Sequence, residues 1–254
     1  MVSRREVVLG GLLTIGWLAT PCGCCAAASA RETRGCILSD EDADKFLAAE
    51  SKPAPTDHVN PTFVSSGDRD LDYAVAQTLS RLTDVWNVLP GFAWFDDYSG
   101  PNAFFTPRKF FDRADGSVIF GRRQLARCLK DKDAPDAAIA ATCAHEFGHV
   151  TQYKRGLHRQ LLEGQPTSKR LELHADFLAG YFAGLRKRER PDFPATVFAN
   201  TRYNRGDFNS TAKSHHGTPD ERAGACVKGF EAGFRDRCSP GEALQVGLRY
   251  VQTL

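Results

Sequence analysis

The sequence predicts an α+β domain in which a small mixed sheet is followed by a mainly helical C-terminal part. Two short runs rich in aromatic and β-branched residues, 92–95 and 117–120, are the best strand candidates. Two long stretches, 136–155 and 168–190, have the apolar spacing of helices packed in a core. The chain has 254 residues, of which 42% are hydrophobic, which is enough for the core of one domain.

The first thirty residues have the pattern of an export signal. Arg4 and Arg5 precede an apolar run, 7–19, that is too short to span a bilayer, and Ala-Ser-Ala at 28–30 is a small-residue cleavage site. Residues 3–8 resemble the twin-arginine export motif, so the twin-arginine and general secretory routes both stay open. We therefore expect an exported protein, periplasmic or extracellular, with no stable membrane insertion after the signal is removed.

Residues 31–66 are predicted to be an N-terminal strap or prosegment with a linker. Ser39 can cap an acidic helix, and prolines follow at positions 53, 55 and 61. From residue 67 to residue 254 we expect one domain. Its first helix should run from Asp68 to Trp86, with these apolar residues facing inward: Leu71, Val75, Leu79, Leu82 and Val85.

The residues His-Glu-Phe-Gly-His at 145–149 lie in the middle of the helix predicted for 136–155. Pro135 suits its first turn, and Gly156 supplies a left-handed stop. On a helix, two histidines four residues apart face the same side and can bind one zinc ion, with Glu146 beside them. A buried imidazole pair without a metal is the alternative, and it is costly. We therefore predict His145 and His149 as zinc ligands.

The third ligand is expected from the next helix, which Thr167 or Ser168 can cap. Glu172 and Asp176 are four residues apart and share one face. Glutamate completes a His2Glu set with an open fourth position, and an aspartate can accept the second ring N–H of a ligand histidine. His174 is the competing ligand, but it points about 200° away from Glu172. The alternative is that both carboxylates lie on a solvated face.

Small residues line one side of this second helix: Ala179, Gly180, Ala183 and Gly184. We expect this side to let the helix approach the histidine-bearing helix closely. The chain then ends in two further helices. Each begins with a capping box and a proline at the first helical position, at 218–221 and 239–242.

The motif at 145–149, followed by Glu-Leu-His-Ala-Asp at 172–176, resembles the paired motifs of the gluzincins, the thermolysin-like zinc peptidases. Among these it is similar to the CAAX-prenyl-protease-like and bacterial neutral zinc metallopeptidase families. Residues 102–104 and 116–125 resemble their substrate-side strand and strand-to-helix step, and His216 with Arg222 resembles the segment that carries their transition-state histidine. The resemblance covers most of the chain after the signal, but without the transmembrane helices of the prenyl-protease relatives. It implies a zincin-like fold with an edge strand packed on the HExxH helix.

The resemblance implies a zinc metallopeptidase domain at 67–254 that binds one zinc ion per chain and hydrolyses peptide bonds of a protein or peptide substrate. Glu146 would activate a zinc-bound water. His216 would stabilise the oxyanion, with His215 as the competing residue, and Asn102 and Ala103 would pair with an extended substrate. An exported zinc-binding protein without proteolytic activity is the alternative function, and a binding module with an accidental motif is a third.

Charge and cysteine content refine these expectations. The net charge is +2, and residues 1–30 contribute Arg4, Arg5 and Glu6, so +1 remains after processing and no strong field attracts nucleic acid. An odd number of cysteines after the signal predicts disulfides plus one thiol in an exported protein. The expected thiol is Cys143, and the expected pairs are Cys226 with Cys238 and Cys36 with Cys128.

Overall fold

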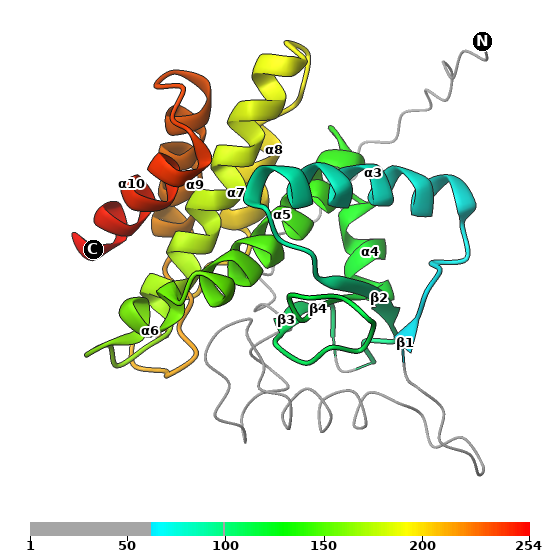
Figure 1. Ribbon diagram of the computed structural model, residues 1–254, viewed down its shortest axis with the longest axis horizontal. Helices are drawn as coiled ribbons and strands as arrows, with labels where there is room; N and C mark the ends of the chain where they lie inside the picture. The colour runs from blue at the N-terminus through cyan, green and yellow to red at the C-terminus, as the bar shows by residue number, and fades with distance from the viewer. Residues whose placement is uncertain (1–61, 99) are drawn as a thin grey trace, which may run out of the picture.

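The computed structural model describes residues 62–98 and 100–254, which form a mixed α+β arrangement (Figure 1). The predicted signal at 1–30, the helix near Ser39 and the cysteine at position 36 lie outside the described residues. Within the described part, none of the helices combines the length and the apolar character needed to cross a membrane.

A four-stranded mixed sheet lies at one side of the molecule, in the order β1-β2-β4-β3 (Figure 1). The central strands β2 and β4 are parallel, and each has an antiparallel neighbour, β1 and β3 respectively. The predicted strands at 92–95 and 117–120 are confirmed as β2 and β4. The strand bounds are Thr62–Phe63 for β1, Gly91–Phe95 for β2, Ala103–Thr106 for β3 and Ser117–Gly121 for β4.

Side chains of the strands alternate between two apolar clusters, as a strand buried on both faces requires. Trp94, Phe105 and Phe120 join the main core together with the helices. Phe95, Phe104 and Ile119 point to the other face and form a smaller cluster with Ala93, against which Phe110 and Phe111 pack. Strand β1 lies within the segment predicted as a strap, so at least Thr62 and Phe63 belong to the sheet.

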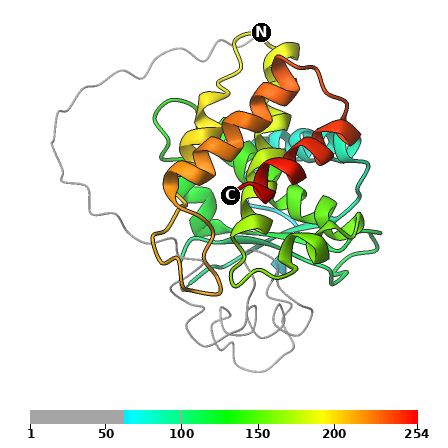
Figure 2. The same ribbon diagram turned by 90° about the vertical axis from the view of Figure 1, so that its left-hand side faces the viewer.

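The helices divide into a group next to the sheet and a C-terminal group (Figures 1 and 2). Helices α3, α4 and α5 lie next to the sheet, and β3 contacts α5. Helices α7, α9 and α10 pack on one another at the other side of the molecule. The bounds are Arg69–Trp86 for α3, Arg122–Cys128 for α4, Pro135–Lys154 for α5, Leu157–Leu162 for α6, Lys169–Glu189 for α7, Thr196–Tyr203 for α8, Pro219–Phe234 for α9 and Pro240–Gln252 for α10.

The helix ends follow the local signals in the sequence. Asp68 caps α3 by accepting hydrogen bonds from two main-chain N–H groups of the first turn. Gly156 has a φ of 70°, the left-handed conformation expected after α5. Both predicted capping boxes are present, with Thr218 on α9 and Ser239 on α10. These predictions are therefore confirmed.

The small residues of α7 pack differently from the prediction. A Cβ atom at Gly180 would lie 1.8 Å from the main-chain oxygen of Cys226, and one at Gly184 would lie 2.7 Å from that of Phe230. Both partners belong to α9, so the glycines of α7 admit α9 and not α5, and the expectation is wrong for them. The close approach of α5 to α7 is made at Gly148, where a Cβ would lie 3.0 Å from the Cα of Ala175.

The predicted disulfide between Cys226 and Cys238 is wrong, because both residues are free thiols. Cys226 is buried, and the main-chain N–H of Cys238 donates to the oxygen of Ala232, which lies six residues or roughly 9 Å further along α9, whereas a disulfide needs Cα atoms within about 7 Å. Burial raises the pKa of Cys226 to about 12. Cys128 is also free, and its expected partner lies outside the described residues. Cys143 is a buried free thiol as predicted, and burial raises its pKa.

Candidate metal centre

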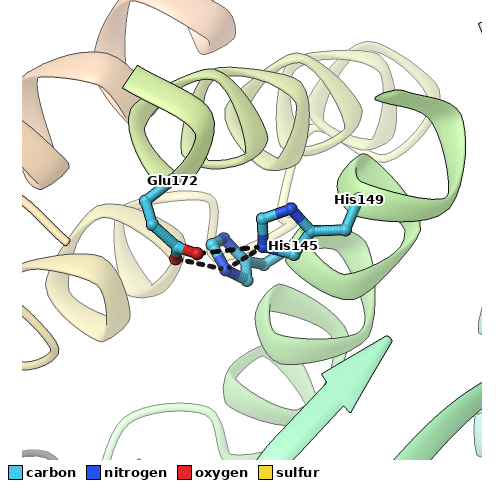
Figure 3. A group of neighbouring side chains, drawn as sticks. All are labelled: His145, His149 and Glu172. Carbon is cyan, nitrogen blue, oxygen red and sulfur yellow. Dashed lines mark hydrogen bonds and ion pairs between the residues drawn. The ribbon is translucent and has the colours of Figure 1, made fainter. Parts of the chain in front are cut away.

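Three side chains from α5 and α7 meet at one point inside the molecule (Figure 3). The Nε2 atoms of His145 and His149 are 3.2 Å apart. The carboxylate of Glu172, on the first turn of α7, places one oxygen 3.3 Å from Nε2 of His145 and the other 3.4 Å from Nε2 of His149. None of the three side chains is more than 1% exposed.

The spacing of these atoms fits a zinc ion. Zinc binds histidine nitrogen and carboxylate oxygen at about 2.0–2.1 Å, so a tetrahedral site holds its ligand atoms roughly 3.3–3.4 Å apart. The two Nε2 atoms are 3.2 Å apart, and each lies 3.3 or 3.4 Å from a different oxygen of Glu172. With one ligand atom taken from each residue, the three atoms lie within 4.8 Å of one another. This buried His145, His149 and Glu172 group could therefore bind a metal ion.

Asp176 determines which ring nitrogen of His145 carries the proton. Its Oδ1 lies 2.7 Å from Nδ1 of His145, and both its oxygens accept hydrogen bonds from Arg222, at 2.7 Å from Nε and 3.0 Å from Nη2. Burial alone would raise the pKa of Asp176, but Arg222 and His145 together lower it to about 2. An ionised aspartate can only accept, so the proton of a neutral His145 lies on Nδ1 and Nε2 directs a lone pair at the cluster.

Gln152 determines which ring nitrogen of His149 carries the proton. Its Oε1 lies 2.9 Å from Nδ1 of His149, while its Nε2 donates to the main-chain oxygen of Leu171 at 2.8 Å. Because the amide nitrogen is committed to a carbonyl, the oxygen must face the histidine, and Nδ1 must donate. The same Nε2 lies 3.1 Å from Nδ1 of His174, and burial lowers the pKa of that histidine to about 4.

The protonation pattern leaves electron pairs facing one another in the centre of the cluster. Two imidazole lone pairs and the carboxylate of Glu172 converge there. Burial opposes ionisation of Glu172, but the neighbouring His216 holds its pKa well below the usual range. A cation between these three groups relieves their mutual repulsion, which is why the arrangement suits a metal ion.

Glu146 and the second predicted catalytic residue, His216, are also buried. Glu146 follows His145 on α5 and is 2% exposed. His216 lies in the loop before α9, where its main-chain N–H donates to Oδ2 of Asp207 at 3.0 Å and its Nδ1 lies 3.7 Å from the same oxygen. Among the groups that lower the pKa of Glu172, His216 comes first.

His215 also contacts Asp207, but its hydrogen bonds hold the loop before α9 in place. Its Nδ1 lies 2.6 Å from Oδ1 of Asp207, and its main-chain oxygen accepts a hydrogen bond from Oγ of Ser168 at 3.0 Å. Ser168 occupies the N-cap position of α7 but makes no side-chain cap, so its hydroxyl ties the loop to α7 instead of capping it. Burial opposes ionisation of Asp207, but both histidines hold its pKa below the usual range.

The main-chain groups of Asn102, a predicted substrate-binding residue, have partners within the protein. Its N–H donates to Oδ2 of Asp97 at 2.9 Å, and its C=O accepts from the N–H of Gly121 at 2.9 Å. In the antiparallel ladder with β4 the alternate residues point away from the partner strand. Ala103 and Phe105 therefore direct their main-chain groups to the outer side of the edge strand.

Three residues that support the cluster were absent from the predicted site. Gln152 is three residues after His149 on the same helix face, a spacing that could have identified it. Arg222 was named only as part of the family resemblance, without a role in the site. Asp207 lies in a loop and is brought to His216 by tertiary structure alone, and no pattern in the sequence points to it.

Comparison with known proteins assigns the chain to no family. No protein-family model matches the chain, and neither curated proteins nor solved structures show significant similarity to it.

Proposed function

We propose that this protein is an exported zinc-dependent endopeptidase with a zincin-like fold. The observation that carries the proposal is the buried His145, His149 and Glu172 group, in which one ligand atom from each residue lies within 4.8 Å of the others. The HExxH sequence adds a glutamate beside the ligands, and the three-ligand set leaves a fourth position for the reaction. The signal-like residues 1–30 support export.

The proposed reaction needs one proton carrier and one oxyanion donor from the chain. When bound, zinc supplies Lewis acidity that polarises the scissile carbonyl and increases the acidity of the attacking water. Glu146 accepts the proton of that water and delivers it to the departing amine. His216, held by Asp207, donates to the oxygen that becomes negative as the carbonyl is attacked.

The edge strand offers a place for an extended peptide. Strand β3 is at the end of the sheet in the described residues and contacts α5, which carries both histidines. The outward main-chain groups of Ala103 and Phe105 can pair with a substrate strand, which would bring a peptide bond alongside the metal ligands.

One observation favours the second candidate function, a zinc-binding protein without proteolytic activity. The ligands His145, His149 and Glu172 are at most 1% exposed, and Glu146 is 2% exposed. Burial of this degree suits an ion that holds two helices together, whereas a hydrolytic site must admit a substrate.

Peptide hydrolysis by the processed protein separates the two functions. The zinc-loaded protein should cleave members of a peptide library, and Glu146→Gln should abolish cleavage while keeping one zinc per chain, because it removes the base and leaves every ligand. Glu163→Gln, the same change at an exposed glutamate, is the matched control. Full cleavage by Glu146→Gln would refute the mechanism, and stoichiometric zinc with no cleavage by any form would favour the second function.

A further inference from the structure

We propose that Gln152 and His174 are positioning residues that set the zinc affinity of this protein through His149. The inference rests on the proposed zinc site and concerns how one of its ligands is held. Gln152 and His174 are fully buried on α5 and α7, and neither is a ligand.

A chain of hydrogen bonds links the ligand to the C-terminal helix. Nδ1 of His149 meets Oε1 of Gln152 at 2.9 Å, Nε2 of Gln152 meets Nδ1 of His174 at 3.1 Å, and Nε2 of His174 meets the main-chain oxygen of Leu244 at 3.3 Å. Leu244 lies on α10, so three helices share this connection.

Each hydrogen bond in this series determines the donor and the acceptor of the next one. A carbonyl oxygen only accepts, so Nε2 of His174 donates to Leu244, and Nδ1 of neutral His174 must then accept. The amide nitrogen of Gln152 lies between two acceptors, this Nδ1 and the main-chain oxygen of Leu171 at 2.8 Å. Both acceptors select the orientation of the amide that turns its oxygen to His149.

The opposite orientation would interfere with zinc binding. With the amide turned over, its nitrogen would face Nδ1 of His149, which would have to accept and carry its proton on Nε2 instead. That proton would point at the metal position and would have to leave before zinc could bind. Gln152 and His174 therefore keep His149 in its ligand tautomer before any metal arrives.

The other ligand histidine is held by a charged partner, which gives an internal comparison. His145 faces the ionised Asp176, whose charge Arg222 compensates. His149 faces a neutral amide, whose orientation depends on the two acceptors beyond it. Loss of those acceptors should therefore affect His149 and leave the partner of His145 in place.

Two isosteric pairs of variants test the proposal on the full processed chain, with the zinc dissociation constant measured by competition with a chelator. Gln152→Met removes the acceptor for His149 and should weaken zinc binding by about 10- to 100-fold. Gln152→Glu keeps an oxygen toward His149 but places its second oxygen against Nδ1 of His174 and the main-chain oxygen of Leu171, so it should weaken zinc binding less than Gln152→Met does. His174→Leu removes the acceptor for Gln152 and should weaken binding by about tenfold, whereas His174→Asn keeps an acceptor near the Nδ1 position and should weaken it much less.

The thermal midpoints of the metal-free variants separate positioning from packing. Both changes at His174 remove the bond to Leu244 and part of the ring, so both metal-free forms should melt lower to a similar extent. Only the loss of zinc affinity should differ within the pair. Equal zinc affinities of His174→Leu and His174→Asn would overturn the role of His174. If Gln152→Met fails to fold, the His174 pair still decides.

The proposed zinc site and the positioning role can be refuted independently of each other. Wild-type protein that binds no zinc would refute the metal centre itself. Wild-type protein that binds zinc tightly, with Gln152→Met binding it equally, would overturn only the positioning role. The visible spectrum of the cobalt-substituted protein adds a readout at the metal, since a displaced His149 changes the coordination and so the spectrum.

Discussion

At the scale of single residues, Glu172 is, among the residues that the structure describes, the one proposed ligand that joins α7 to the histidines of α5. Each of its oxygens faces one histidine, at 3.3 and 3.4 Å. We predict that Glu172→Ala loses most of the zinc, because two ligands hold the ion much less tightly than three. Elemental analysis after dialysis measures this, with Glu163→Ala at an exposed position as the control. One zinc per chain retained in Glu172→Ala would contradict the ligand set.

The neighbouring histidines of the loop before α9 give a second prediction at this scale. His216→Ala should lower kcat and kcat/KM together by on the order of a hundredfold or more, with KM and zinc content little changed, because the proposed donor acts only on the developing oxyanion. His215→Ala should have a much smaller effect, since its ring serves Asp207 and the loop. Steady-state kinetics of both variants on one peptide decides between them. A large loss only at His215 would assign the role to that residue.

The same scale shows which site residues a sequence can reveal. His145, His149, Glu172 and Asp176 lie at helical spacing, and helix geometry alone places each pair on one face. Asp207 reaches the site through the fold of a loop, and its distance along the chain from His149 carries no signal. The hydrogen bonds of Asn102 with Asp97 and Gly121 are likewise a tertiary arrangement that no pattern in the sequence indicates.

At the scale of elements, α7 is the central helix of the site. It contacts α5 on one side, and α9 and α10 elsewhere. Glycine in a sequence indicates close approach but does not identify the neighbour, which is why Gly180 was assigned to the wrong interface. Long helices and buried strands were predictable because their caps and apolar spacing are local. Strand β1 has two residues and depends on its pairing with β2, so the sequence pattern did not reveal it.

The contact of α7 with α9 gives a prediction about stability. In Gly180→Ala the added Cβ would meet the main-chain oxygen of Cys226, and a main-chain atom cannot turn aside as a side chain can. The helices must separate, so the free energy of unfolding should fall by about 1–3 kcal/mol. Gly241→Ala is the control, because its Cβ meets nothing within 4 Å and alanine favours a helix, so that variant should gain about 0.5 kcal/mol. Urea unfolding of both metal-free variants measures the difference, and equal stabilities would contradict the close packing.

At the scale of the whole molecule, the site draws on segments that lie far apart in the chain. The proposed ligands come from α5 and α7, Arg222 comes from α9, and the connection through His174 ends on α10. Strand β3 contacts the same α5 from the sheet side. A metal ion bound to both α5 and α7 would therefore link the sheet-side helices to the C-terminal helices. Its loss should affect the stability of both groups of helices together.

Removal of zinc should accordingly lower the stability of the entire domain. A ligand that binds only the folded state stabilises it by about 4 kcal/mol when its free concentration is a thousand times the dissociation constant. For a domain of this size such a change corresponds to a shift of the thermal midpoint of roughly 8–16 °C. We predict a midpoint that falls by this order when a chelator is added to the zinc-loaded protein and recovers when zinc is restored. Glu172→Ala, which lacks a ligand, should melt at the same temperature with and without chelator. A midpoint of the wild type that is insensitive to chelator, at a zinc content of one per chain before treatment and none after it, would show that the ion does not connect α5 and α7 energetically.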